Sequence, residues 1–188
     1  MNILFNLTDI LKKKDYNYIF NLFLFLYLIF GLYLSVNTGI TADELTEQRN
    51  WQLKLELIKG FFANSDTVYS DLLESGQELK KEFTDSTDDL RFYGIGFHYF
   101  SQIYLFLAGL IVKFENFSVE TSKILLNHSF IFFVYFLSGI LAKKIVNLLI
   151  KDKFFSNIFL IFYLFYPYLL GHGFYNPKDT PFLFAWIL

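Results

Sequence analysis

Residues 124–142 read ILLNHSFIFFVYFLSGILA, and this stretch decides the class of the protein. It is almost wholly apolar and close to the roughly 20 residues that a helix needs to cross a bilayer. Lys143 and Lys144 follow it directly, and Lys151 and Lys153 lie shortly after them. Because short loops rich in lysine stay in the cytoplasm, the stretch predicts a transmembrane helix that ends on the cytoplasmic side.

The composition supports a membrane protein. Hydrophobic residues make up 54% of the 188 residues and aromatic residues 22%, which exceeds what a soluble domain of this size normally contains. The net charge of −2 argues against nucleic acid as a partner. With no cysteine, the chain has no disulfide, no thiolate nucleophile and no cysteine-ligated metal. We therefore predict an all-α polytopic protein of a plasma or inner membrane, whose natural surroundings are the lipid bilayer.

Four further apolar runs lie outward from this stretch: residues 18–36, 96–112, 154–170 and 180–188. Lysines at positions 12–14 precede the first run, which raises the alternative of a signal peptide. Signal sequences have shorter apolar regions of about 7–15 residues that end in small residues, so an uncleaved anchor with a cytoplasmic N-terminus fits better. The last run is still apolar at Leu188, so we expect this chain to be the N-terminal part of a longer, truncated protein.

The run over residues 96–112 decides the topology. Its roughly 17 residues reach only about 26 Å, and His98, Ser101 and Gln102 lie near its start. If it crossed the membrane, the lysines at 143–153 would lie outside; if it lies in the interface, they lie inside. The interfacial alternative therefore predicts these segments in order: 1–17 cytoplasmic, 18–36 spanning, 37–120 outer loop with an interfacial helix at 96–112, 121–142 spanning, 143–153 cytoplasmic, 154–170 spanning, 171–179 outer loop, and 180–188 the start of a fourth span.

The long outer loop begins with an amphipathic pattern. Four large apolar residues recur at spacings of four, three and four, which places them on one helix face: Trp51, Leu55, Ile58 and Phe62. We therefore expect a bundle of transmembrane helices whose first outer loop contains amphipathic and interfacial helices.

Two polar motifs lie at the predicted outer surface. In TADE, Thr41 and Glu44 have the spacing of a capping box, whereas Asp43 is also placed to accept a proton or hold a cation. In NPKDTPF, Lys178 and Asp179 lie between two prolines. They could simply snorkel and cap the next helix. Ionisable residues close to lipid nevertheless usually face a cavity, each other or a substrate, and a lysine beside an aspartate suits a phosphate next to a reacting hydroxyl.

Three stretches together resemble the GT-C glycosyltransferases: ADE at 42–44, YGIGFHYF at 93–100 and NPKDTPF at 176–182. The chain is similar to the N-terminal part of family 39-like enzymes, the group of the protein O-mannosyltransferases and the lipid A aminoarabinose transferases. The resemblance implies transfer of a sugar from a polyprenyl-phosphate donor, with inversion, to a hydroxyl of a protein, lipid or glycan acceptor on the outer membrane face.

The same resemblance implies the roles of individual residues. Asp43 matches the aspartate proposed as general base, and Asp179 matches the second-loop acid that organises the acceptor or a cation. The remaining substrate-binding candidates are Glu44, Lys178, His172, Asn176 and Arg91, with Lys178 stabilising the departing phosphate. Some members of the family use a divalent metal. Two carboxylates from separate loops make a poor metal site without further ligands, so we predict neither a metal nor another cofactor.

Two other functions compete with this interpretation. A transporter or channel fragment would use Asp43 and Asp179 as ion-coupling acids, and it predicts acids inside the spanning segments. A non-catalytic membrane assembly protein would bind a partner through its acidic loop, and it predicts no dependence on a lipid-phosphate donor.

Overall fold

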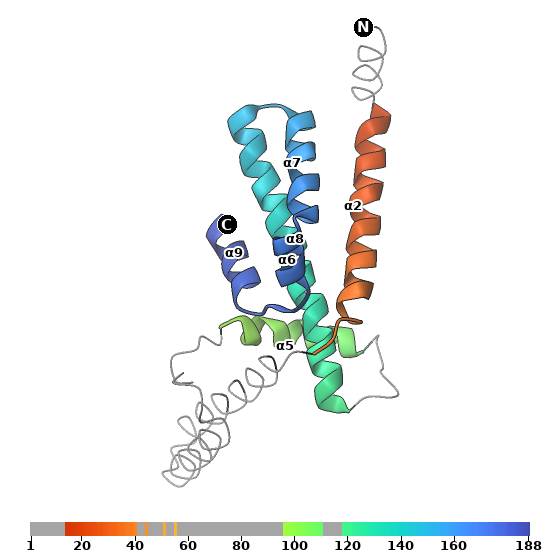
Figure 1. Ribbon diagram of the computed structural model, residues 1–188, viewed down its shortest axis with the longest axis vertical. Coiled ribbons are helices and arrows are strands. Elements are labelled where there is room, and N and C mark those ends of the chain that lie inside the picture. The colour runs from red at the N-terminus through yellow and green to blue at the C-terminus, as the bar shows by residue number, and fades with distance from the viewer. Residues whose placement is uncertain (1–13, 41–43, 45–50, 52–54, 56–95, 111–117) are drawn as a thin grey trace, which may run out of the picture. The chain divides into compact units, whose positions relative to one another are not determined.

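The computed structural model describes residues 14–40, 44, 51, 55, 96–110 and 118–188. Every element in these residues is a helix, as the composition predicts. The helices are α2 (Lys14–Ser35), α5 (Gly96–Gly109), α6 (Val119–Ile150), α7 (Lys153–Phe165), α8 (Pro167–Tyr175) and α9 (Asp179–Ile187) (Figure 1). The chain forms two compact units, one of Met1–Thr38 with Leu125–Leu188 and the other of Gly39–Ile124.

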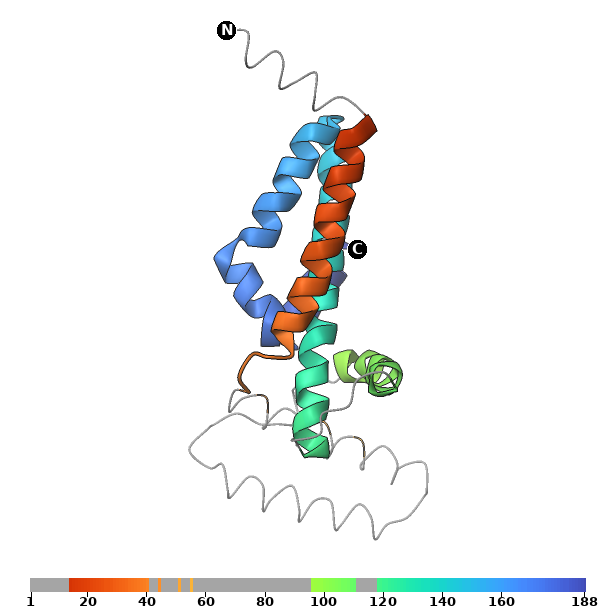
Figure 2. The same cartoon turned by 90° about the vertical axis from the view of Figure 1, so that its right-hand side faces the viewer.

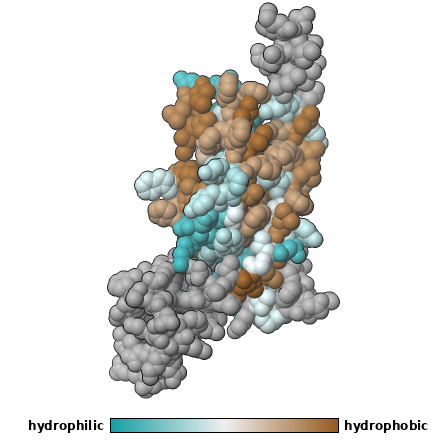
Figure 3. Space-filling model, viewed as in Figure 1, coloured by the Kyte–Doolittle hydropathy of each residue, from teal (hydrophilic) through white to brown (hydrophobic). Residues whose placement is uncertain are grey.

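Two of the described helices are long and apolar enough to cross a membrane. They cover Tyr16–Ser35 and Thr121–Ile150, each with a mean hydropathy of 1.9, and α7 with α8 counts as a third if the pair is one span. Tyr18 and Phe30 on α2 are 73% and 61% exposed, and Figure 3 shows apolar residues across this surface. A surface of this kind is compatible with membrane association because lipid, not water, would cover it.

The segment expected to be cytoplasmic at 143–153 is helical over most of its length, and its cytoplasmic position stays a prediction. Helix α6 continues to Ile150, because the sequence after the lysines is IVNLLI and contains neither glycine nor proline. The chain turns at Lys151, whose φ is 58°. Asp152 then caps α7, since its side chain accepts hydrogen bonds from the backbone N–H groups of Phe154 and Phe155 at 2.8 and 3.3 Å.

The span expected over 154–170 is not one continuous helix, and whether it crosses a membrane stays a prediction. Helix α7 ends at Phe165, Tyr166 is extended with ψ 115°, and Pro167 begins α8. Proline has no N–H and disfavours helical backbone in the residue before it, so the helix breaks here and the two parts are bent by 60° (Figure 2). Helix α8 then continues to Tyr175, so the expected outer loop at 171–179 is reduced to residues 176–178.

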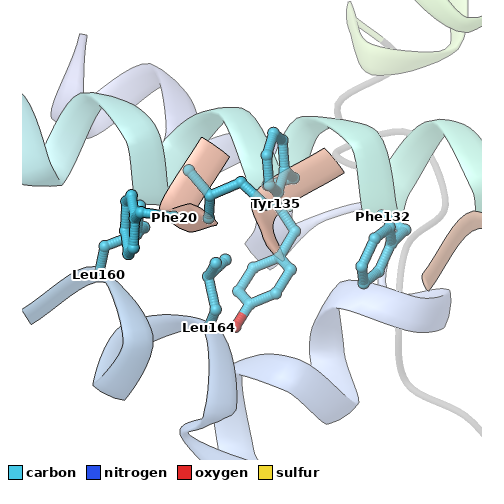
Figure 4. Close-up of a cluster of buried hydrophobic side chains, with 7 residues drawn as sticks. Phe20, Phe132, Tyr135, Leu160 and Leu164 are labelled. Carbon is cyan, nitrogen blue, oxygen red and sulfur yellow. The ribbon is translucent and has the colours of Figure 1, made fainter. Parts of the chain in front are cut away.

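The first unit has one apolar core between α2, α6, α7 and α8. Its buried members are Phe20, Leu24, Phe132, Tyr135, Phe136, Leu160 and Leu164, several of which are drawn in Figure 4. Glycines let the backbones approach the large rings closely. A Cβ at Gly31 would overlap the Phe132 ring, and one at Gly173 would lie 2.8 Å from the Tyr135 ring.

The second unit is described around α5. The helix expected at 96–112 is confirmed over Gly96–Gly109, and its interfacial position stays a prediction. Trp51 is buried and stacks on His98 at 5.4 Å, and its edge meets Tyr99 at 4.9 Å. The apolar face predicted from Trp51 therefore packs on α5 at this residue, whereas Ile58 and Phe62 lie outside the described residues.

Gly31 should not tolerate a larger side chain. Gly31→Ala would push a methyl group into the buried Phe132 ring, so we expect it to destabilise the protein by about 1–3 kcal/mol. Thermal unfolding of the purified protein in detergent measures this loss. Gly171→Ala is the matched control, because nothing lies within 4 Å of its Cβ position and alanine favours the helix by about 0.5–1 kcal/mol. Equal unfolding temperatures for the two variants would contradict the packing described here.

Candidate functional site

The predicted NPKD motif folds into a hydrogen-bonded cluster at the junction of α8 and α9, centred on Asn176. Its amide nitrogen lies 2.7 Å from His172 Nδ1 and donates to Asp179 Oδ2 at 2.9 Å. Its side-chain oxygen, Oδ1, accepts hydrogen bonds from the backbone N–H groups of Lys178 and Asp179 at 3.0 and 2.8 Å. We call His172, Asn176, Lys178 and Asp179 the Asn176 cluster.

These contacts fix the orientation of the Asn176 amide. Turning the amide over would place its oxygen against the Asp179 carboxylate and its N–H₂ group against two backbone donors. In the orientation described, one amide hydrogen goes to Asp179 and the other to His172 Nδ1. His172 Nδ1 must therefore accept, which puts the proton of the neutral imidazole on Nε2.

The cluster is tied into both helices. His172 lies in the last turn of α8, and its carbonyl accepts from the backbone N–H of Asn176 at 2.9 Å and from the buried Thr180 hydroxyl at 3.0 Å. The imidazole packs against Tyr168 with ring centroids 4.4 Å apart. The spacing of four residues between His172 and Asn176 puts both on one face at the end of α8.

The charged members of the cluster stay accessible. The Asp179 side chain is 70% exposed, and its Oδ2 lies 3.6 Å from His172 Nδ1, beyond hydrogen-bond distance. Asp179 is the first residue of α9, where a carboxylate complements the helix dipole. It is not the cap of that helix, because the Asn176 carbonyl oxygen takes the first backbone N–H groups. The arrangement presents a carboxylate and an adjacent exposed lysine at one helix start.

The other predicted site residues are not brought into this cluster. Asp43 and Arg91 lie outside the described residues. Glu44 is buried and belongs to the second unit, which is described by itself. His98 is buried and stacked on Trp51, which is the usual position of a structural histidine. The described residues contain no group of three or more His, Asp or Glu side chains that could hold a metal ion.

The sequence analysis missed a second buried histidine. His128 is 1% exposed, and its Nδ1 lies 3.2 Å from the Ser35 carbonyl and 2.9 Å from Thr38 Oγ1. The Thr38 hydroxyl itself donates to the Ser35 carbonyl at 2.6 Å, so both partners of Nδ1 are acceptors and Nδ1 carries the proton. His128 therefore ties α6 to the C-terminal end of α2. The polar triplet of Asn127, His128 and Ser129 inside an apolar run was the signal for it.

The chain was compared with models of protein families, with curated proteins and with solved structures, and none of them matches it. The case for a function therefore depends on the residues of the site and on the resemblance carried by the three motifs.

The two histidines of the first unit should be opposite tautomers. Nitrogen-15 NMR of histidine-labelled protein at alkaline pH, where imidazoles are neutral, should show one ring with its proton on Nε2, assigned to His172, and one with its proton on Nδ1, assigned to His128. Asn176→Ala should remove the tautomer preference of His172 alone, and His172→Gln and His128→Gln assign the signals. A His172 signal with the proton on Nδ1 would contradict the amide orientation given above.

Proposed function

We propose that the protein is a membrane glycosyltransferase that takes a sugar from a polyprenyl-phosphate donor and transfers it, with inversion, to an acceptor hydroxyl. The resemblance to the GT-C enzymes suggests the reaction. The observation that carries it in this structure is the Asn176 cluster, which holds an exposed carboxylate next to an exposed lysine at the start of α9. Such a pair suits a phosphate headgroup beside a hydroxyl.

The proposed reaction assigns one step to each group. The acceptor oxygen forms a bond to the anomeric carbon as its proton passes to the Asp43 carboxylate. The bond between that carbon and the phosphate oxygen breaks, and the polyprenyl phosphate leaves with the electron pair. Lys178 stabilises the charge on the departing phosphate, and Asp179 orients the acceptor hydroxyl.

The distribution of acids favours this proposal over ion-coupled transport. Acids that couple ions usually lie within the spans and face the interior. In the described part of the chain, neither Tyr16–Ser35 nor Thr121–Ile150 contains an aspartate or a glutamate, and the same is true of α7 and α8. Asp152 and Asp179 lie at helix ends, which is where a headgroup or a soluble acceptor would meet them.

The proposal includes a topology. We propose that residues 1–17 and the turn at Lys151 face the cytoplasm, that the bent pair of α7 and α8 crosses the membrane, and that the Asn176 cluster lies at the outer face. That Asp43 also belongs to the outer face is what the resemblance implies. The lysines at 143, 144, 151 and 153 support this orientation because they surround the turn between α6 and α7.

The topology predicts which positions an impermeant reagent can reach. The protein has no native cysteine, so Lys151→Cys and Lys178→Cys are clean reporters. In intact cells an impermeant maleimide should label Cys at 178 and spare Cys at 151 until the membrane is opened. Labelling of both positions in intact cells would mean that α7 and α8 form a re-entrant pair and would contradict the proposal.

The reaction predicts that one carboxylate dominates the rate. With polyprenyl-phosphate-linked mannose, glucose and aminoarabinose as labelled probes and membranes as the acceptor source, Asp43→Asn should lower sugar transfer by about 10²–10⁴-fold. Lys178→Ala should instead weaken donor binding by about tenfold, because it removes a charged hydrogen bond to phosphate.

Lys144→Ala is the matched control for the lysine, because Lys144 is also exposed but lies near the turn at Lys151, which the proposal places on the cytoplasmic side. It should leave transfer unchanged. Normal transfer by Asp43→Asn would remove the general base from the proposal, and absence of transfer from every donor by the unaltered protein would favour the assembly or transport alternatives.

A further inference from the structure

The break between α7 and α8 leaves backbone carbonyls without their helical partners. Pro167 has no N–H, so the Tyr163 carbonyl loses the donor it would have in a continuous helix. The 60° bend also separates the Leu164 carbonyl from the N–H of Tyr168. Inside a membrane no water is present to bond such groups, so a break is stable only if the protein supplies donors.

Tyrosine hydroxyls from two other helices supply them. The Tyr135 hydroxyl on α6 donates to the Tyr163 carbonyl at 2.8 Å, and Figure 4 shows this hydroxyl directed at the helix that carries Leu164. The Tyr27 hydroxyl on α2 donates to the Leu164 carbonyl at 2.6 Å. The backbone N–H of Tyr166 adds only a long contact of 3.3 Å to the Tyr163 carbonyl.

Packing holds both tyrosines in place. Tyr135 is 1% exposed, and its ring stacks on Tyr163 of α7 at 5.7 Å. The same ring also lies close to Gly173 of α8, where a Cβ would be 2.8 Å from the ring atoms. The Tyr27 ring meets Phe165, the last residue of α7, edge to face at 5.3 Å. Tyr135 thus contacts both arms of the bent pair, and Tyr27 contacts the end of the first arm.

We infer that Tyr27 and Tyr135 are positioning residues, whose hydroxyls stabilise the break at Pro167 and so set the direction of α8. Helix α8 ends at the Asn176 cluster, so the same two hydroxyls determine where that cluster lies relative to α2 and α6. This inference holds whatever the cluster binds, and it is independent of the proposed sugar transfer.

Rescue by alanine at the break tests the inference. Tyr135→Phe and Tyr27→Phe should each lower the unfolding temperature of the purified protein by about 2–4 °C. In a Pro167→Ala background the restored N–H can bond the Tyr163 carbonyl. Tyr135→Phe should then lower the unfolding temperature by less than about half as much. Equal losses with and without Pro167 would overturn the inference.

Tyr163→Phe is the matched control. Its hydroxyl bonds to Ser138 Oγ at 2.7 Å, and not to a carbonyl at the break. Loss of this hydroxyl should therefore lower the unfolding temperature by the same amount with Pro167 and with Pro167→Ala. If Tyr135→Phe yields no folded protein, recovery of folded protein by adding Pro167→Ala supports the inference. Failure of that double variant, when Pro167→Ala alone folds, overturns it.

A distance measurement reads the direction of α8 directly. Spin labels on cysteines at 153 and 175 would be about 33 Å apart along a straight helix and about 29 Å apart with the 60° bend. Removing both hydroxyls, with Tyr27→Phe and Tyr135→Phe together, should broaden the distance distribution towards the longer value. A distribution identical to that of the unaltered tyrosines would overturn the inference, and neither readout depends on any transfer activity.

Discussion

The structure of the first unit depends on one constraint, which is that a backbone shielded from water must satisfy its polar groups within the protein. A continuous helix does so without help, but Pro167 interrupts that helix part of the way along. Hydroxyl donors from α2 and α6 compensate for the interruption, and each reaches a different carbonyl. The break therefore requires three helices to be assembled around it, so helix packing and the local bend have to form together. This coupling explains why the largest fully buried side chain in the described residues is a tyrosine.

The sequence predicted which segments are apolar helices better than it predicted where those helices end. Apolar runs report where a helix can lie in lipid, but they do not report where its hydrogen bonds stop. Helix α6 therefore continues past Lys143 and Lys144 as far as Ile150, although the lysines were expected to begin a loop. Pro167 could have been recognised as a break from its chemistry alone. Its consequence could not, because the compensating Tyr27 lies 137 positions from the carbonyl it bonds, and no local pattern joins them.

The sequence predicted which residues form the Asn176 cluster but not how they are hydrogen-bonded to one another. His172, Asn176, Lys178 and Asp179 were chosen from the motif, and they form one group in the structure. The central position of Asn176 could not be predicted, because it depends on the orientation of the side-chain amide. That orientation is set by the backbone N–H groups of Lys178 and Asp179, which are in place only when α9 has formed. The polar triplet at 127–129 marked His128 as unusual but could not show its role, because its partners, the Ser35 carbonyl and the Thr38 hydroxyl, lie about 90 positions away in the sequence.

The presence of an amide at the centre of the cluster has a chemical consequence. A direct ion pair between a protonated His172 and Asp179 would have neutralised the carboxylate. Asn176 instead donates to both, so His172 Nδ1 and Asp179 Oδ2 each accept one of its amide hydrogens. Only one oxygen of Asp179 is engaged in this bond, and the side chain remains 70% exposed. The cluster thus keeps a negative charge and the adjacent Lys178 at one helix start, where each remains accessible to a ligand. Burial of the same charges would have required them to neutralise one another.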